Sequence, residues 1–528
     1  MKKRVLLGIC VLTLALASCK AKNNSSDTTT DDEDTSEVSD DTTDTGVSTQ
    51  TSVITLTSNL SEGVTLTGAG EYEEYKTVTV SADAYLGYEF KGWKKDGEIV
   101  SEDETYIFSV PVDDIALEAY YLIDDDIKNL VYTSDYDTCV VSGVVDKSVS
   151  DLVVPEYVTK IEEGALSGCG NLKSLTLPFI GGENKGPLDG DKPPLGYVFG
   201  ETEYEGSTRV VQLNPYAYAY TNSDGEISYT SGLNAQYYSY IPSGLTKVSL
   251  VGAKCVTAYA FSRMTLDTVE ISNSLIYTDN FAFYDCTISN IYYQGDAADI
   301  CNIDSSRGSL FGSADYDSLY FYIDGSYTNF PNEIVIPEGV TEIKPGAFKN
   351  CTSTESITIP KSIKKIGEDA FRYVPAANVY YNGSLDDWCS IEIGEAGNGL
   401  ATTYDQGVAY IKTLYVLDDN GDVSYNGKTY KAVTGNITLN KIGQGSFCDY
   451  DNISEVVLEE GITVIPDFAF FRSSITSIYI PSTVTEIEYF ALGGSDLKTI
   501  YNASQIDLSS AEAREEYDIA DDVEVIVV

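Results

Sequence analysis

The sequence predicts a mostly β fold with short helical arcs, in which an irregular repeat solenoid follows a small β-rich module and a disordered tether. The motif PEGVTEIKPGAFKNC, which begins at Pro337, returns in related form at Pro360, 23 residues later. A period of this length is typical of stacked turns. Apolar and polar residues also alternate at positions 356–359, as in a half-buried strand. One repeat is therefore expected to contain a strand, a turn and a short helical arc.

The chain begins with a segment that has the layout of a secretory signal. Basic residues at positions 2–4 precede an apolar run, and Leu-Ala-Ser-Cys occupies positions 16–19. These four residues resemble a lipobox, the processing site of bacterial lipoproteins. The resemblance implies that residues 1–19 are a signal peptide and that Cys19 receives the lipid. An ordinary cleaved signal is the alternative. Lipidation would anchor the protein to the outside of the cell envelope without a spanning helix.

Residues 20–50 contain mainly Ser, Thr and Asp and almost no apolar side chains. Such a composition cannot offset the entropy lost on folding, so a disordered tether is predicted. Residues 51–122 contain short alternating or apolar runs separated by Gly and Asp turns, which predicts a small β-rich module. Two roles are open for this module: ligand binding, or spacing the solenoid from the tether.

The core of this module, from Leu86 onward, resembles the small β repeat of the internalin-B type found on bacterial surface proteins. Gly87, Phe90, Gly92 and Trp93 match the part of that pattern that packs the core. The resemblance therefore implies that Trp93 is buried. The alternative is that Trp93 stacks on a carbohydrate.

The repeat motif recurs on both sides of the stretch that defines it. Copies lie at residues 152–178 and 456–492, and the pairs Ala260-Phe261 and Ala282-Phe283 lie between them. The pattern I-x-I-P-x-x-V-T-x-I-x-x-x-A-F-x-x-C resembles the BspA-like (Treponema-type) leucine-rich repeats of bacterial surface proteins. A solenoid at residues 151–505 is therefore expected, in which each repeat buries its apolar face against its neighbours.

Segments that depart from the repeat complete the domain plan. Residues 123–150 are predicted to be a linker and a hairpin that caps the first apolar layer of the solenoid. Insertions are expected near residues 179–240, 299–331 and 394–433, and insertions in solenoids map to loops on one face. The acidic tail at residues 506–528 ends in Val-Glu-Val-Ile-Val-Val, which is typical of a closing strand.

The composition excludes several classes of protein. The net charge of −49 disfavours binding to nucleic acid or anionic lipid. The chain has no histidine, which excludes Ser-His-Asp and Cys-His catalysis. Two-carboxylate glycoside hydrolysis stays open, because it needs no histidine. Neither GxGxxG nor a P-loop is present, so no cofactor is expected.

No metal site is expected either. The string DDNGD at positions 418–422 lacks the downstream Glu of a calcium-binding loop, and the residues after it favour a hairpin turn. No Cys-x-x-Cys pair supports a zinc site. Eight cysteines follow Cys19, and Cys169, Cys286 and Cys351 each lie four residues after the Ala of a repeat. We expect these thiols to be buried and reduced rather than paired.

One row of outward-facing side chains is the candidate binding site. If Ile357 and Ile359 point inward, Thr358 points outward, and the same register gives an outward residue in each repeat. The members of the row are Val153, Thr176, Ser249, Glu270, Tyr292, Val335, Thr358, Tyr380, Val457, Tyr479 and Tyr501. Tyrosine supplies contact area at low entropic cost. The predicted ligand contacts are Thr176, Glu270, Tyr292, Thr358, Tyr380, Tyr479 and Tyr501. The alternative is that tyrosine is merely a good strand former here.

The resemblance implies a non-catalytic surface lipoprotein that recognises or adheres to an extracellular protein of a host or neighbouring cell. Its other partner would be the membrane, through Cys19, and we expect a monomer. A carbohydrate-binding or nutrient-scavenging lipoprotein is the first alternative, in which Trp93 or Tyr216, Tyr218 and Tyr220 would stack on sugars. A glycan-acting enzyme with catalytic carboxylates is the second alternative.

Overall fold

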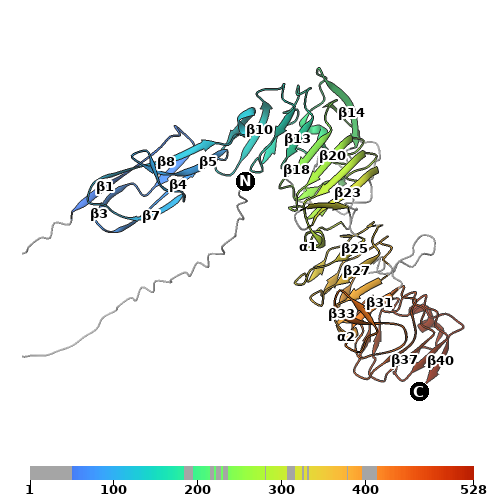
Figure 1. Cartoon of the computed structure of the whole chain (residues 1–528). Helices are drawn as coiled ribbons and strands as arrows, with labels where there is room; N and C mark the ends of the chain where they lie inside the picture. The colour runs from blue at the N-terminus through green and yellow to red at the C-terminus, as the bar shows by residue number, and fades with distance from the viewer. Residues whose placement is uncertain are drawn as a thin grey trace, which may run out of the picture. The chain divides into compact units, whose positions relative to one another are not determined.

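The computed structural model describes residues 50–183, 194–213, 219–221, 227–229, 236–279, 281–305, 315–323, 326–329, 332–351, 353–376, 378–394 and 413–528. The predicted signal peptide with Cys19, and the predicted tether up to residue 49, lie outside these residues. The fold is mostly β, as the sequence predicts, and its few helices are short (Figure 1). The described α-helices are α1 (Ala297–Cys301), α2 (Leu385–Trp388) and α3 (Ala511–Glu516).

The β-rich module consists of two small sheets around one core. The first sheet contains, in spatial order, β3 (Gly70–Glu73), β1 (Thr51–Ser58), β8 (Ile115–Ile123), β5 (Tyr88–Lys95) and β6 (Glu98–Ser101). The second contains β2 (Val64–Thr67), β4 (Thr77–Ala84) and β7 (Thr105–Ser109). Trp93 is completely buried, and its Nε1 donates a hydrogen bond to the carbonyl of Glu104 at 3.2 Å. Trp93 therefore packs the core, and an enclosed indole cannot stack on a sugar.

A hairpin opens the solenoid, as the sequence predicts. The 3-10 helix η1 (Ile127–Asn129) leads into β9 (Leu130–Ser134), which pairs antiparallel with β10 (Cys139–Val144). β10 pairs parallel with β12 (Lys160–Ile161) of the first coil. Leu130, Val141 and Val144 are buried in the same core as the repeats. The hairpin thus covers the first apolar layer of the stack.

The coils align their strands in three main sheets, which are mostly parallel. The first contains, in spatial order, β11 (Asp151–Val153), β13 (Ser174–Leu177), β18 (Lys247–Leu250), β20 (Thr265–Ile271), β22 (Thr287–Tyr293), β23 (Asp315–Ile323) and β24 (Ser326–Asn329). The second contains β25 (Glu333–Val335), β27 (Ser356–Ile359), β29 (Asn378–Tyr381), β31 (Thr413–Leu417), β33 (Lys428–Ala432) and β32 (Val423–Tyr425). The third contains β34 (Gly435–Leu439), β35 (Ile453–Leu458), β37 (Ser477–Ile480), β39 (Thr499–Asn502) and β40 (Glu524–Val527). β40 pairs parallel with β39, so the predicted closing strand is confirmed.

Many coils contain a second short strand, so the prediction of one strand per repeat is incomplete. These strands form a separate row of parallel pairs. They are β19 (Cys255–Val256), β21 (Tyr277–Thr278), β26 (Glu342–Ile343), β28 (Lys365–Ile366), β30 (Glu392–Ile393), β36 (Val464–Ile465) and β38 (Glu486–Ile487). Ile343, Ile366 and Ile393 are register partners and are buried in the core. This row explains the V-T-x-I part of the motif, because the Ile is the inward residue of the second strand.

The arc that follows the second strand consists of turns that are bonded to the next coil. The backbone N–H groups of Gly346 and Phe348 donate to the carbonyls of Glu368 and Ala370 at 2.9 and 2.8 Å. Gly346 has a φ of 66°, a left-handed conformation that glycine adopts without steric cost. Neighbouring coils therefore share backbone hydrogen bonds along the arcs as well as along both rows of strands.

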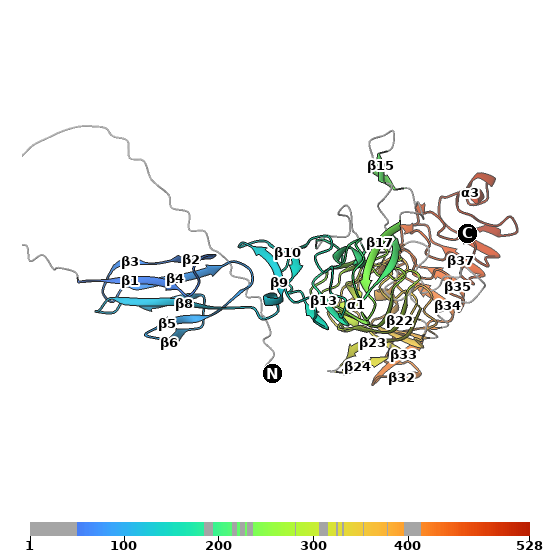
Figure 2. The same ribbon diagram turned by 90° about the horizontal axis from the view of Figure 1, so that it is seen from above.

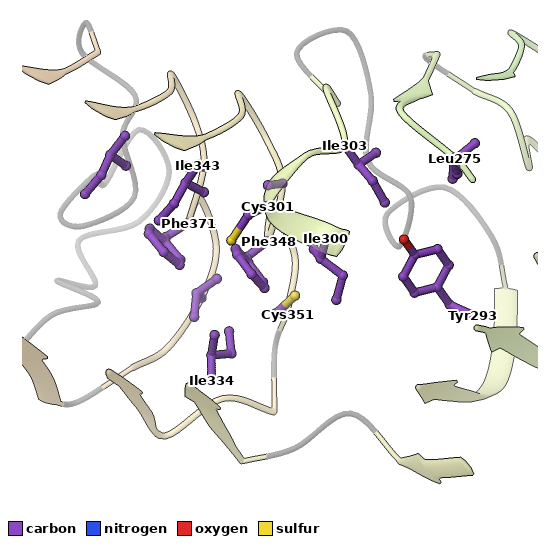
Figure 3. Packing of buried hydrophobic residues seen from close by; sticks show 14 of the residues in the cluster. Leu275, Tyr293, Ile300, Cys301, Ile303, Ile334, Ile343, Phe348, Cys351 and Phe371 are labelled. Atoms are coloured by element: carbon purple, nitrogen blue, oxygen red, sulfur yellow. The ribbon is translucent and has the colours of Figure 1, made fainter. Parts of the chain in front are cut away.

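Phenylalanine side chains from successive arcs stack inside the solenoid (Figure 3). The ring centroids of Phe348 and Phe371 lie 5.4 Å apart with an interplanar angle of 7°. Phe261–Phe283 and Phe447–Phe470 repeat the arrangement at 5.1 and 5.7 Å. One continuous core cluster runs from Ile127 to Val523. The Ala-Phe signature of the motif is therefore the inward part of each arc, as the periodicity predicts.

Cysteines occupy this core beside the phenylalanines. Cys169 and Cys351 are free and buried, and the buried thiol of Cys286 donates to the carbonyl of Phe283 at 2.7 Å. Burial raises the pKa of the Cys389 thiol to about 12. The prediction of buried, reduced thiols in the repeat is confirmed for Cys169 and Cys351.

The three segments predicted as insertions interrupt the sequence pattern but supply strands and core residues. The first contains η2 (Leu195–Val198) and the pairs β14 (Ser207–Leu213) with β17 (Gln236–Pro242) and β15 (Ala219–Thr221) with β16 (Ile227–Tyr229). Leu195 and Phe199 are fully buried in the solenoid core.

The other two segments end sheets with antiparallel strands, so they are more than surface loops. β23 and β31 continue the parallel main sheets, and each then pairs with an antiparallel strand, β24 or β33. Figure 2 shows β23 with β24, and β33 with β32. Residues 418–422 connect β31 to β32, but β33 lies between these two strands, so the predicted hairpin turn is wrong at this position. The hairpin turn joins β32 to β33 instead. The backbone donors and acceptors on the outer edges of β23 and β31 are paired in this way.

Candidate functional site

The strand pairing confirms the register of the predicted outward row. The successive register partners of the row in the first main sheet are Val153, Thr176, Ser249, Glu270, Tyr292 and Tyr320. The residues on either side of the row are buried in the core, as Val269 and Ile271 are beside Glu270. The row therefore lies on the outer face of the sheet. Exposure varies along it, and it divides into three groups.

The first group contains Tyr292, Tyr320 and Tyr327. The rings of Tyr292 and Tyr320 are stacked with centroids 4.7 Å apart, and Tyr327 of β24 meets Tyr292 edge-on at 4.9 Å. Tyr327 is 39% exposed, whereas Tyr292 and Tyr320 are half-buried. The three rings hold one another in place, so they would lose little further rotational freedom when a ligand binds.

A charged pair borders the first group. Lys247 Nζ lies 2.7 Å from the Glu270 carboxylate, and the Ser249 hydroxyl donates to the same carboxylate at 2.8 Å. Thr176 is half-buried and lies on the other side of Ser249 along the row. Glu270 is thus paired with Lys247 and is not an isolated acid. The pair borders the aromatic rings of the first group.

The second group, Thr358, Tyr380 and Tyr415, is covered, and this corrects the prediction that Thr358 and Tyr380 are open to a ligand. They follow Val335 in register on the second main sheet. Thr358 is buried, and Tyr380 is only 7% exposed. The ring of Tyr425 from β32 stacks on Tyr380 with centroids 3.7 Å apart and an interplanar angle of 8°. Burial raises the pKa of the Tyr380 hydroxyl.

The hairpin that covers the second group reaches back across the sheet. The Asn426 amide donates to the Glu333 carboxylate at 2.9 Å, and the hydroxyls of Ser356 and Tyr425 lie 3.3 Å apart. Asn426 and Gly427 form the tip with φ values of 46° and 74°, which are the conformations of a type I′ hairpin turn. The Asn-Gly pair in the sequence is typical of a hairpin turn, but it does not show which residues the hairpin covers.

The third group contains Val457, Tyr479 and Tyr501 on the third main sheet, where they are register partners of one another. Val457 and Tyr501 are exposed, Tyr501 by 40%, and Tyr479 is half-buried. Two pairs of predicted contacts are thus adjacent on partly exposed strands. They are Tyr479 with Tyr501, and Glu270 with Tyr292. The repeat motif does not predict Tyr320, Tyr327, Tyr415 and Tyr425, because they lie in segments that lack it.

Tyr216 and Tyr218 lie outside the described residues, and the side chain of Tyr220 is not described. Within the described ranges no group of three His, Cys, Asp or Glu residues is arranged to hold a metal ion. No helix in the described part of the chain is both long and apolar enough to span a bilayer.

Asp449 is a carboxyl with a strongly raised pKa, and it lies away from the row. Burial raises the pKa of Asp449 on an arc to about 7, although Arg472 Nε lies 3.5 Å away and opposes the shift. Asp449 is buried, and the row does not include it.

Comparison with known families identifies both folded parts. A model described as "BspA type Leucine rich repeat region" matches six copies at residues 145–180, 210–305, 326–389 and 421–514, together more than half of the chain. A model described as "Divergent InlB B-repeat domain" matches residues 54–124. A search of curated proteins found no match.

Several solved bacterial structures are similar at low identity. A leucine-rich repeat protein from Bacteroides ovatus is 15% identical, with 77% of this chain and 99% of that one covered and a TM-score of 0.29. A leucine-rich cell surface protein from Faecalibacterium prausnitzii is 15% identical, with coverage of 74% and 97% and a TM-score of 0.22. A leucine-rich repeat protein from Eubacterium ventriosum is 14% identical, with coverage of 61% and 85% and a TM-score of 0.26. The TM-scores are low, so these structures carry no argument about function.

Proposed function

This chain belongs to the family of BspA-type leucine-rich repeat proteins, and from that premise we propose that it is a non-catalytic surface lipoprotein that recognises an extracellular protein. Cys19 would carry the lipid, and residues 20–50 would hold the folded part away from the membrane. The ligand would belong to a host or a neighbouring cell, and the protein would act as a monomer. Labelling with a radioactive fatty acid, lost in a Cys19→Ser variant, tests the anchor.

The observation that carries the proposal is the partial exposure of register-aligned tyrosines on neighbouring strands. In the first group Tyr292 and Tyr320 stack on each other, and in the third group Tyr479 and Tyr501 are partners on β37 and β39. Tyrosine is frequent among residues that dominate binding energy at protein interfaces. The backbone below these side chains is bonded on both sides, so the surface is rigid and pre-organised for binding.

The proposal that the protein is non-catalytic rests on the chemistry of the row. The chain has no histidine, and Glu270, a carboxylate among the predicted contacts, is paired with Lys247. A carboxyl that works as a general acid or base needs access to the reacting group, whereas Asp449, with its raised pKa, is buried.

A binding assay with paired variants tests the strand face. The full chain would be immobilised and exposed to extracellular-matrix proteins, envelope proteins and a glycan array. Tyr292→Ala/Tyr327→Ala and Tyr479→Ala/Tyr501→Ala remove the first and third groups separately. Tyr75→Ala is the matched control, because Tyr75 is 72% exposed and lies in the β-rich module.

We expect a protein ligand whose affinity falls about tenfold or more in at least one paired variant, as for loss of a dominant interface side chain. The Tyr75→Ala control should bind as the unmodified chain does. Protein binding that survives both paired changes would move the site away from the main sheets. A ligand found only on the glycan array would favour the carbohydrate-binding alternative.

A further inference from the structure

A second aromatic surface lies on the arcs of the last coils rather than on the main sheets. It consists of Phe468, Phe471, Tyr489 and Phe490, which we call the arc cluster. Ring centroids lie 5.5 Å apart for Phe468–Phe471, 5.2 Å for Phe471–Phe490 and 4.1 Å for Tyr489–Phe490. Tyr489 is 62% exposed, Phe471 and Phe490 are half-buried, and Phe468 is buried. The arc cluster is therefore an apolar patch that the core does not enclose.

The backbone under the arc cluster is left-handed at two of its aromatic residues. Phe468 and Phe490 have φ values of 57° and 51°, and each directly precedes the Ala of its arc. Glycine occupies the equivalent position in some coils, as at Gly164 and Gly346, whereas Tyr259 and Phe281 occupy it in others with φ values of 57° and 59°. Glycine adopts this conformation without the steric cost that a side chain incurs. The left-handed conformation at this position is thus a general feature of the arcs, and a glycine at position 490 would fit the backbone.

Carboxylates border the arc cluster. The Glu488 carboxylate accepts a hydrogen bond from the backbone N–H of Asp467 at 3.0 Å, so these two acids lie together beside Phe468 and Tyr489 in the chain. Arg472 is the nearby cation: its guanidinium lies over the ring of Phe471, 5.7 Å from the centroid, and 3.5 Å from Asp449. The border therefore carries more negative than positive charge.

Charge distinguishes between the possible occupants. Two copies of a chain with a net charge of −49 repel each other, so a second copy is disfavoured. A basic partner is attracted by the same field. Aromatic rings bind lysine and arginine side chains over their faces, and arginine stacks especially well because its guanidinium is planar. The aromatic surface and its acidic border suit the same kind of ligand.

We propose that the arc cluster docks a basic polypeptide segment, with arginine or lysine side chains on the exposed rings and their charges facing Asp467 and Glu488. This surface is separate from the tyrosine row, so one chain could hold two partners at once. Substituting the tyrosines of the row with alanine should leave binding at the arc cluster intact.

An arginine peptide tests this proposal. The full chain would be titrated with octaarginine by calorimetry at physiological salt, beside Tyr489→Ala, Phe490→Gly and the double variant. Tyr75→Gly is the matched control, because Tyr75 is exposed, has a φ of 66° and lies in the β-rich module. All these changes leave the net charge unaltered, so general Coulombic attraction stays the same.

We expect the double variant to bind octaarginine about tenfold more weakly, from the loss of two cation–π contacts, and Tyr75→Gly to bind normally. Since glycine suits the backbone at position 490, Phe490→Gly should keep its melting temperature. If it does not, the exposed Tyr489→Ala carries the test alone. Equal affinity in all variants would overturn the proposal, because binding would then follow charge only. The proposal would also be overturned if the variants kept octaarginine binding but lost cellohexaose binding or dimerisation.

Discussion

The second and third main sheets are built from the same repeat but present their outer faces differently. Tyr380 and Tyr415 are register partners on one, as Tyr479 and Tyr501 are on the other. Yet Tyr380 is 7% exposed and Tyr501 is 40% exposed. The difference comes from the hairpin of β33 and β32, which places Tyr425 against Tyr380. The repeat decides which side chains point outward, and a segment outside the repeat decides whether they can be reached.

The comparison also shows how a solenoid can vary its binding surface without altering its core. The stacked phenylalanines have nearly the same spacing beneath both sheets, 5.4 Å for Phe348–Phe371 and 5.7 Å for Phe447–Phe470. A segment added at a sheet end changes only the outer face, because each coil depends mainly on contacts with its neighbours.

The largest expected effect tests the shared core of the two sheets. Phe348→Asp and Phe470→Asp should each lower the free energy of unfolding by at least about 4 kcal/mol, because each removes a buried ring and buries a charge without a partner. Urea unfolding followed by circular dichroism measures the loss. Tyr75→Asp, at an exposed position, is the control. An unchanged unfolding curve for Phe348→Asp would contradict the assignment of the Ala-Phe signature to the core.

A smaller effect concerns buried carboxyls on the arcs of the two regions. Asp369 lies 2.8 Å from Lys349 Nζ and 3.0 Å from Arg372. Asp449 is 3.5 Å from Arg472, and burial raises its pKa to about 7. A raised folded-state pKa means that protonation of Asp449 stabilises the fold. That stabilisation is complete below the unfolded pKa, about 4, and is lost as the pH rises through 7.

We therefore expect Asp449→Asn, which stays neutral, to weaken the pH dependence of stability between about pH 4 and pH 7. At pH 8 the variant should exceed the unmodified chain by on the order of 2 kcal/mol. Urea unfolding at pH 5 and pH 8 measures both quantities. If the free energy of unfolding changes by the same amount between pH 5 and pH 8 in both proteins, Asp449 is not neutral at the lower pH.

The smallest effects sharpen the contrast between the two faces. Tyr425→Ala should lower the free energy of unfolding by about 1–2 kcal/mol, because it removes the ring stacked on the buried Tyr380. Tyr501→Ala should change it by less than about 0.5 kcal/mol, as at other surface positions. The thermal midpoints of the two variants compare these costs directly. Equal losses would mean that Tyr425 does not cover the second group.

The sequence alone determined the local and nearest-neighbour features of this protein. Alternation of Ile357, Thr358 and Ile359 set the inward and outward positions, and the fixed period carried that register from coil to coil. The opening hairpin, the closing strand, the burial of Trp93 and the inward Ala-Phe pairs were also predictable. Each of these depends on residues close in the chain or on copies one repeat away, where a single short motif contains the necessary information.

The tertiary structure alone decided which outward residues remain accessible. Tyr425 lies 45 positions after Tyr380 in the chain, and no periodic pattern links them. The same holds for Tyr327 against Tyr292. It also holds for the arc cluster, in which Tyr489 is exposed while Phe468 is buried. A repeat specifies direction because side-chain orientation follows from the local backbone. Coverage depends on segments that follow no period, so only the folded chain shows it.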